Sequence, residues 1–250
     1  MTIRKNQLTP RPAAKKTGRA KSFRCPYSAA EIEEIFRRFS IQRPEPTTEL
    51  HFTNPYTLLV AVALSAQMTD AGVNKATRPL FASVDTPQKM RDLGEEKLGE
   101  AIRTINFHRT KARNVIAMAR RLIEDFGGEV PQSREALESL PGVGRKTANV
   151  MLSTVFGQPA LAVDTHILRL GNRLKLAPGK TPDEVEENFL RIIPKAYLPH
   201  AHHWLILHGR YTCKARRPEC EHCIIADLCK SPEKTCDVPA ELVEVPPREI

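Results

Sequence analysis

The segment Leu140-Pro-Gly-Val-Gly-Arg-Lys-Thr147 decides the fold, because it places two glycines between two helical patterns. Ser133 is a preferred N-cap residue and predicts a short helix that ends near Leu140. A second helix is expected from about Arg145 to Phe156. Glycine tolerates positive φ, so the Pro-Gly-Val-Gly turn can be tight. The pattern predicts a helix–hairpin–helix unit over residues 133–157.

Helical patterns also fill the chain on both sides of this unit. An apolar stripe predicts a long helix over residues 108–126, and residues 202–211 form another before a cysteine-rich segment. No stretch alternates apolar and polar residues over a useful strand length. Together these patterns predict an all-α protein. Helix N-caps are expected at Ser28, Asn54, Asp70, Thr86, Ser133 and Thr181.

The hairpin is a candidate binding site for a phosphate group. A tight turn followed by a helix start leaves several backbone N–H groups unpaired, and such groups bind anions. DNA is the natural source of that phosphate, so Gly142, Val143, Gly144 and Arg145 are predicted to contact DNA. The alternative is a packing joint between two helices that binds nothing, and glycine spacing alone does not separate the two.

Lys146 is a candidate nucleophile because it falls in the first turn of the second helix. The positive end of the helix dipole and the neighbouring Arg145 both disfavour a charged ammonium, which lowers the expected pKa of Lys146. A neutral lysine amine attacks carbonyl-like carbons and forms Schiff bases. The alternative is a simple phosphate contact.

Asp164 is a second candidate, in the stretch Ala162-Val-Asp-Thr-His-Ile167. It precedes an expected helix, where aspartate is a common N-cap. A cap alone would explain the residue. The two roles are compatible, since a cap also fixes the rotamer of a carboxylate that faces a developing positive charge.

Four cysteines fall within one short segment with the spacing C-x6-C-x2-C-x5-C. The chain has no secretory signal, so a metal centre is favoured over disulfides. The spacing does not choose between zinc and an iron–sulfur cluster, because four thiolates suit both. Cys25 and Cys236 lie outside the pattern and receive no role. The four candidate ligands are Cys213, Cys220, Cys223 and Cys229.

The net charge of +9 is unevenly distributed. Eight of the 38 basic residues lie in residues 1–24 without any acid, so the remaining 30 nearly balance the 29 acidic residues. Residues 1–24 are predicted to be a disordered basic arm, which either raises DNA affinity or is a solvated tail without a role. The apolar run over residues 56–66 is too short to span a membrane, so a cytoplasmic protein is expected.

Taken together, the motifs resemble the endonuclease III family of iron–sulfur helix–hairpin–helix DNA glycosylases. The resemblance covers roughly residues 28–230, and the combination of motifs is far more specific than any one of them. Its segments are Leu64-Ser-Ala-Gln-Met-Thr-Asp70, Leu140-Pro-Gly-Val-Gly-Arg-Lys-Thr-Ala-Asn149, Val163-Asp-Thr-His166, His202-His-Trp-Leu-Ile-Leu-His-Gly-Arg-Tyr-Thr-Cys213 and the cysteine cluster.

This resemblance implies two helical domains that flank a DNA-binding groove. A six-helix barrel domain would span residues 49–159, and a cluster domain would combine residues 25–48 with 160–230, followed by an irregular tail over 231–250. It also implies a [4Fe-4S] cluster on the four cysteines. The cluster would shape a basic loop whose predicted DNA contacts are Lys214, Arg216 and Arg217.

The resemblance further implies a reaction. Lys146 corresponds to the family's catalytic lysine and Asp164 to its catalytic aspartate, which together remove a damaged base and cut the strand by β-elimination. The implied partner is double-stranded DNA with oxidised pyrimidines or abasic sites, bound by a monomer associated with the nucleoid. The nearest alternatives are an adenine-mismatch glycosylase, which lacks the nucleophilic lysine, and a noncatalytic DNA-binding module.

Three further residues are implied to contact DNA around the flipped base, namely Gln67, Phe107 and His108. Gln67 matches the residue that fills the gap, and Phe107 sits where the family has an apolar wedge. Asn106-Phe107-His108 departs from the usual Gly-Leu-Tyr or Gly-Phe-Tyr, so a core role for Phe107 is the alternative. Met68 is also larger than expected in its loop. The histidines of residues 202–208 are expected to pack a helix, with metal binding as the lesser alternative.

Overall fold

The computed structural model describes residues 23–246 and contains no β-strand among them. The predicted all-α class is confirmed, and the predicted basic arm lies outside the described residues except for its last two. Three short 3-10 helices are η1 (Lys195–Tyr197), η2 (Cys220–His222) and η3 (Ala240–Leu242). The α-helices are α1 (Ala29–Gln42), α2 (Pro55–Leu64), α3 (Asp70–Phe81), α4 (Pro87–Leu93), α5 (Glu95–Ala101), α6 (His108–Phe126), α7 (Arg134–Glu138), α8 (Arg145–Thr154), α9 (Thr165–Arg173), α10 (Pro182–Ile192) and α11 (Leu198–Tyr211).

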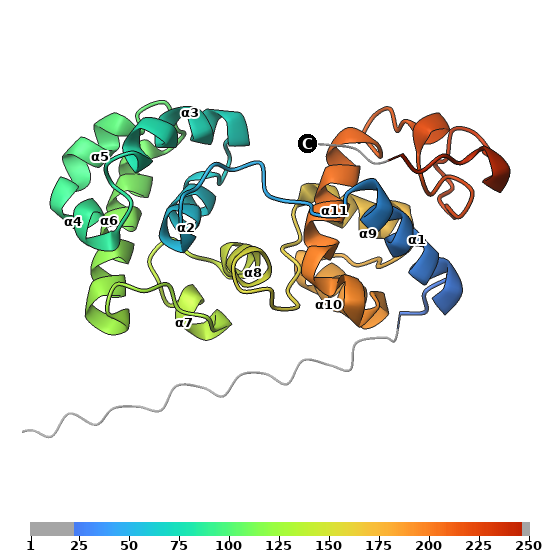
Figure 1. Ribbon diagram of the computed structural model, residues 1–250, viewed down its shortest axis with the longest axis horizontal. Coiled ribbons are helices and arrows are strands. Elements are labelled where there is room, and N and C mark those ends of the chain that lie inside the picture. Colours follow the sequence, from blue (N-terminus) through green and yellow to red (C-terminus); the bar gives the residue numbers. More distant parts are fainter. Residues whose placement is uncertain (1–22, 247–250) are drawn as a thin grey trace, which may run out of the picture.

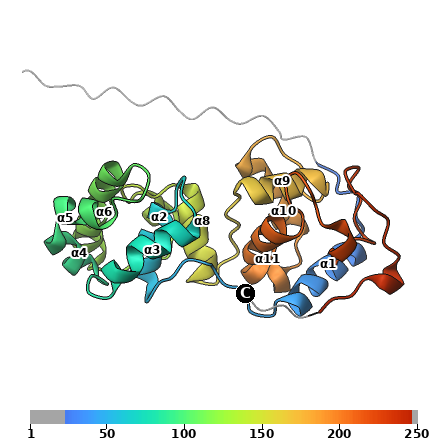
Figure 2. The ribbon, with the colours of Figure 1, turned by 90° about the horizontal axis from the view of Figure 1, so that it is seen from above.

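Two lobes stand side by side, and the chain crosses between them along residues 43–54 and again along 155–164 (Figures 1 and 2). One apolar core is built by α2 to α8. The other is built by α1, α9 to α11 and the cysteine segment. Each core buries its own set of side chains. We propose on this basis that residues 49–159 form one domain and that residues 25–48 and 160–230 form the other.

The first lobe has one more helix than the resemblance implied. Residues 49–159 contain seven α-helices rather than six. The extra break lies at Gly94, which adopts φ 82° and separates α4 from α5. Positive φ suits glycine and ends a right-handed helix, so a single pattern after Thr86 becomes two short helices.

Helix caps explain most of the element boundaries. Ser28 and Asn54 cap their helices as predicted, each within a capping box, and Thr86, Ser133 and Thr181 also cap theirs as predicted. The predicted cap at Asp70 is wrong, because the side chain of Thr69 caps α3 instead.

Asp70 has a different role, in a contact between the lobes. Its carboxylate lies 2.6 Å from Arg210 on α11, and Arg210 also pairs with Glu49 in the first crossing segment. Tyr211 donates a hydrogen bond to the same glutamate. These groups tie α3 and residues 43–54 to the second lobe.

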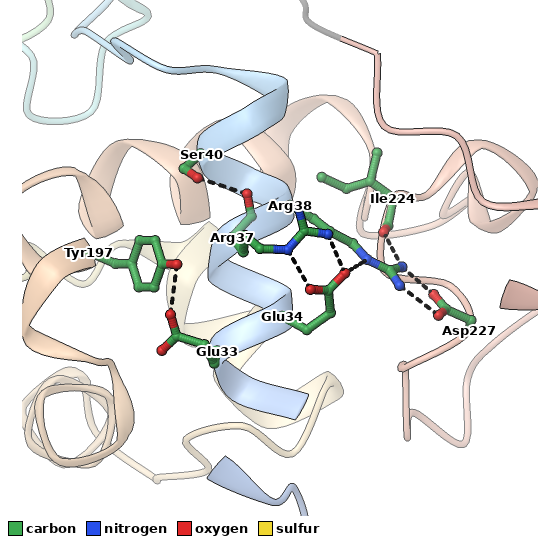
Figure 3. A network of polar contacts seen from close by, with 8 residues as sticks. All are labelled: Glu33, Glu34, Arg37, Arg38, Ser40, Tyr197, Ile224 and Asp227. Atoms are coloured by element: carbon green, nitrogen blue, oxygen red, sulfur yellow. Dashed lines mark hydrogen bonds and ion pairs between the residues drawn. The ribbon is translucent and has the colours of Figure 1, made fainter. Parts of the chain in front are cut away.

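A polar network joins α1 to the cysteine segment (Figure 3). Arg38 forms an ion pair with Asp227, 2.6 Å away, and donates to the Ile224 carbonyl. Both charged side chains are nearly buried, so the pair is well shielded from solvent. Glu34 supports Arg38 from the same helix. The network fixes the loop between Cys223 and Cys229 against the N-terminal helix.

Within residues 23–246, no helix combines the length and apolar character that crossing a membrane requires.

Candidate active site and iron–sulfur site

The hairpin forms as predicted between α7 and α8, but its two glycines differ. Gly142 adopts φ 80°, and a Cβ there would lie 3.1 Å from the Cβ of Asn114. Gly144 adopts φ −104°, which any residue can take, so the expectation of positive φ at this position is wrong. A Cβ at Gly144 would meet no atom within 4 Å. Gly144 therefore leaves open space in front of the turn.

Backbone donors face that space. Gly144 is the N-cap of α8 and provides no side-chain cap, so the first N–H groups of α8 have no side-chain acceptor. This arrangement suits an anion. Val143 differs from its neighbours, because its side chain is buried and its N–H donates to the Leu140 carbonyl. The residue packs the hairpin and has no free donor for DNA.

Arg145, a predicted DNA contact, has partners within the chain. Its guanidinium lies 2.9 Å from Glu186 and 3.4 Å from Asp183, both on α10. The hydrogen bond that Arg145 donates to Glu186 raises the pKa of Arg145. Arg134 reaches the same carboxylate at 3.2 Å, and Glu186 is only 3% exposed. The side chain of Arg145 therefore anchors the hairpin to the second lobe.

A cavity of about 560 Å³ lies where the lobes meet, and it gathers the predicted site residues. Lys146 reaches it from the first turn of α8, and Asp164 reaches it from the start of α9. Gln67 and Met68 line it from the loop after α2. Such a volume accommodates a nucleoside-sized group.

Asp164 is held firmly in this cavity. Its Oδ1 accepts hydrogen bonds from the N–H groups of His166 and Ile167, each at 2.9 Å. The predicted N-cap is confirmed. Because both bonds fall on one oxygen, the second carboxylate oxygen remains available for another partner.

Two buried histidines form part of the cavity wall. Burial lowers the pKa of His203 to about 4, and it lowers the pKa of His202 well below its ordinary value. The rings of the two residues lie in edge contact, with centroids 5.1 Å apart. Both residues belong to α11 and pack within the protein, as predicted, and both stay uncharged at neutral pH.

The depressed pKa of His203 predicts a pH dependence of stability. Its unfolded-state pKa is about 6.5, so on acidification the unfolded chain takes up the proton first. The stabilising effect of the neutral ring is complete above pH ~6.5 and falls until pH ~4. Between pH 7 and 5 we expect this residue alone to remove about 1–2 kcal/mol from the free energy of unfolding.

Urea titrations at the two pH values measure this loss. His203→Gln keeps a polar side chain beside Thr154 (its Oγ1 lies 3.4 Å from the ring nitrogen) and should flatten the pH dependence. An unchanged slope would show that the pKa of His203 is the same in the folded and unfolded states. His200→Gln serves as the control, because His200 is an exposed histidine of the same helix.

Gln67 and Phe107 lie on adjacent loops that project from the first lobe. Phe107 is 65% exposed, so the alternative of a core phenylalanine is wrong. It adopts φ 58° and precedes His108, the half-buried first residue of α6.

Met68 fits its loop by lying against the backbone of Gly72. A Cβ at Gly72 would collide with the terminal methyl group of Met68.

The four cysteines of the predicted metal site line a single cavity in the second lobe. Cys25 and Cys236 do not line it. Burial raises the pKa of Cys223 to about 12 and also raises the pKa of Cys213 and Cys229. Ligation requires thiolates, so loading must displace protons from these groups.

This donor set fits an iron–sulfur cluster. The four thiols surround a cavity, as a multi-iron cluster needs. Arg173 lies beside Cys213, with Nη1 3.7 Å from Sγ, and offsets the negative charge of ligated thiolates.

Arg173 also fixes the basic loop that follows the first cysteine. It donates to the carbonyls of Lys214 and Ala215 at 2.7 and 2.8 Å. Lys214 is paired with Glu219, whereas Arg216 and Arg217 are exposed and free of hydrogen bonds within the described chain. The two arginines are therefore the available cations of this loop.

Three residues with clear structural roles were missed at the sequence level: Glu186, Arg173 and Lys111. Each acts on a partner at least 40 residues away in the chain. Periodicity marks only local helix faces, so no sequence signal identifies such pairs.

Comparisons with known proteins agree with this architecture. Residues 60–195 match the HhH-GPD superfamily of base excision DNA repair proteins, and residues 213–229 match the iron–sulfur binding domain of endonuclease III. Endonuclease III of Escherichia coli K12 is 54% identical over 201 residues, which cover 80% of this chain and 95% of that protein. Endonuclease III of Haemophilus influenzae is 56% identical over the same length and coverage.

Solved structures give the same result. A trapped endonuclease III–DNA covalent intermediate superposes with a TM-score of 0.75 at 43% identity, covering 82% of this chain and 96% of that one. A thermostable thymine-DNA glycosylase matches in fold, with a TM-score of 0.69 at 24% identity over 80% of this chain and 94% of that one.

The fold and the cavity between the lobes define an iron–sulfur helix–hairpin–helix protein of DNA repair. The chain belongs to the HhH-GPD superfamily of base excision DNA repair proteins. It is a DNA glycosylase with lyase activity at abasic sites, it binds DNA, and it carries a [4Fe-4S] cluster.

Proposed function

We propose that the chain removes oxidised pyrimidines from double-stranded DNA by a lysine Schiff base and then cuts the strand by β-elimination. The observation that carries this proposal is the convergence of Lys146 and Asp164, from two different helices, on one cavity between the lobes. A nucleophile and a carboxylate are the pair that displacement at a sugar carbon requires.

The first step needs the base outside the helix, since the sugar carbon is inaccessible within the stack. The neutral Nζ of Lys146 attacks the anomeric carbon as the bond to the base breaks, and the bonding electron pair leaves with the base. Positive charge develops on the sugar, and Asp164 stabilises it. The two hydrogen bonds to Oδ1 already fix the rotamer of Asp164, so the carboxylate needs little reorganisation as the charge develops.

The second step cuts the strand. Loss of a proton from the nitrogen and opening of the sugar ring give a Schiff base between Lys146 and the sugar. The Schiff base acidifies the neighbouring C–H bond. Removal of that proton forms a double bond and expels the 3′ phosphate, and water then hydrolyses the Schiff base to free the amine.

Contacts with the DNA backbone come from both lobes. The uncapped start of α8 at Gly144 supplies N–H donors, and Arg216 and Arg217 supply charge. Gln67 and Phe107 enter the stack around the vacated position. The cluster holds the basic loop in place and supplies no group to the cleavage chemistry. We further propose that the protein acts as a monomer close to the chromosome.

A panel of damaged duplexes tests this proposal. Duplexes with one oxidised pyrimidine or one abasic site should be cut and should form a covalent adduct in borohydride, whereas an undamaged duplex should do neither. An adenine opposite an oxidised guanine should be processed at least ~100-fold more slowly than the pyrimidine lesions. Base release without any adduct would exclude the lysine mechanism and favour water as the nucleophile.

A further inference from the structure

Two loops of the first lobe carry unusual backbone conformations. Gln67 adopts φ 56° and Phe107 φ 58°, and only one other non-glycine residue of the described chain, Lys175, has positive φ. The left-handed region is unfavourable for residues with a Cβ and persists only when neighbouring contacts hold it. These loops end α2 and begin α6.

One side chain joins the two loops. The Nδ2 of Asn106 donates a hydrogen bond of 2.8 Å to the carbonyl of Gln67, which is 39 positions away in the chain. Asn106 immediately precedes Phe107, so this single bond links the backbone of Phe107 to that of Gln67.

A second side chain fixes the start of the Gln67 loop. Lys111 on α6 donates to the carbonyls of Leu64 and Ala66, at 2.9 and 2.6 Å. Leu64 is the last residue of α2, where carbonyls lack an intrahelical partner, and Ala66 lies in the loop that follows. Burial lowers the pKa of Lys111, consistent with its enclosed position under the loop. The base of the Gln67 loop is therefore pinned, and its tip is held by Asn106.

We propose that Asn106 is a positioning residue that makes Gln67 and Phe107 one rigid element for entering duplex DNA at the damaged base pair. The inference rests on the proposed function, because it assigns both residues to the gap left by the flipped base. Insertion must overcome base stacking, so a preformed element loses less conformational freedom than two independent loops. The bond needs a donor, which an asparagine amide provides and a carboxylate lacks.

The test compares duplex with single-stranded substrates. Asn106→Asp replaces the donor by an acceptor of the same shape, and Asn106→Ala removes the donor without adding charge. Each should lower kcat/KM at least ~10-fold on an abasic duplex. Borohydride trapping on single-stranded abasic DNA should stay within ~2-fold, since no stack has to be entered there.

Controls separate positioning from general damage. Asn172→Asp makes the same change at another amide that donates to a backbone carbonyl, in the other lobe. This variant should keep full activity on both substrates. The double variant Asn106→Ala/Phe107→Ala should lower kcat/KM on the duplex by much less than the product of the two single-variant decreases, because the two residues act as a unit. If Asn106 had a purely structural role, its variants would lose activity equally on both substrates and would have a lower Tm.

Equal kcat/KM ratios of duplex to single-stranded DNA in the unchanged protein and both Asn106 variants would overturn this inference. Failure of the proposed function gives a different result, namely no adduct with either substrate in the unchanged protein. Fluorescence of a 2-aminopurine opposite an abasic analogue provides an independent readout. The enhancement on binding should be smaller in both Asn106 variants, and full enhancement would contradict the role.

Discussion

Replacing Lys146 by alanine should lower strand cleavage at abasic sites by at least ~10³-fold and eliminate the borohydride adduct. In the proposed mechanism the amine is the group that becomes bonded to the sugar, and water cannot form a Schiff base. DNA binding should change little, since the contacts proposed for the hairpin are made by its backbone N–H donors rather than by Lys146. Cleavage assays and filter binding with one abasic duplex measure both quantities.

Lys146→Arg is the matched variant for charge. The guanidinium keeps the positive charge but is not a nucleophile at neutral pH. If Lys146 only attracts phosphate, the arginine variant should retain cleavage and the alanine variant should bind weakly. If the amine is the nucleophile, both variants should be inactive and bind with similar affinity. Retained trapping in the alanine variant would assign the chemistry to another amine.

Asp164→Asn should lower the rate of base removal by ~100-fold or more, with little change in stability. Asparagine caps helices about as well as aspartate, so the bonds to His166 and Ile167 can survive while the negative charge is lost. Single-turnover release of an oxidised pyrimidine, with thermal unfolding alongside, separates charge from cap. A near-normal rate in this variant would reduce Asp164 to a structural cap.

Asp164→Ala completes the comparison. It removes the charge and the cap together, so it should also lower the free energy of unfolding by about 1 kcal/mol. The difference in stability between the two variants measures the cap, and their shared loss of rate measures the charge. A rate loss found only in the alanine variant would mean that rotamer control, rather than charge, is the important property.

Much of this fold could be predicted from local sequence. Capping boxes at Ser28 and Asn54, and the Pro-Gly-Val-Gly turn, act over three or four residues, so their signals are visible in the chain. Asp164 could be predicted as a cap for the same reason. Asp70 was misassigned because Thr69 and Asp70 are both good cap residues, and sequence pattern alone does not decide between neighbours.

The features that local sequence does not reveal depend on contacts between distant segments. Arg145 carries a positive charge next to a phosphate-binding turn, yet the buried carboxylate of Glu186 on another lobe takes its side chain. Val143 sits in the same turn but is buried by the core of its lobe. The link from Asn106 to Gln67 spans two loops in the same way. Such pairings follow from tertiary packing, which residue spacing does not encode.

The most direct measurement is the identity of the residue that becomes attached to DNA. The unchanged protein is incubated with an abasic duplex and borohydride, digested with protease, and the peptide that carries the sugar is sequenced by mass spectrometry. We expect a single modified residue, Lys146, with the sugar on its Nζ. Attachment to any other residue, or an efficient cleavage that yields no adduct, would contradict it.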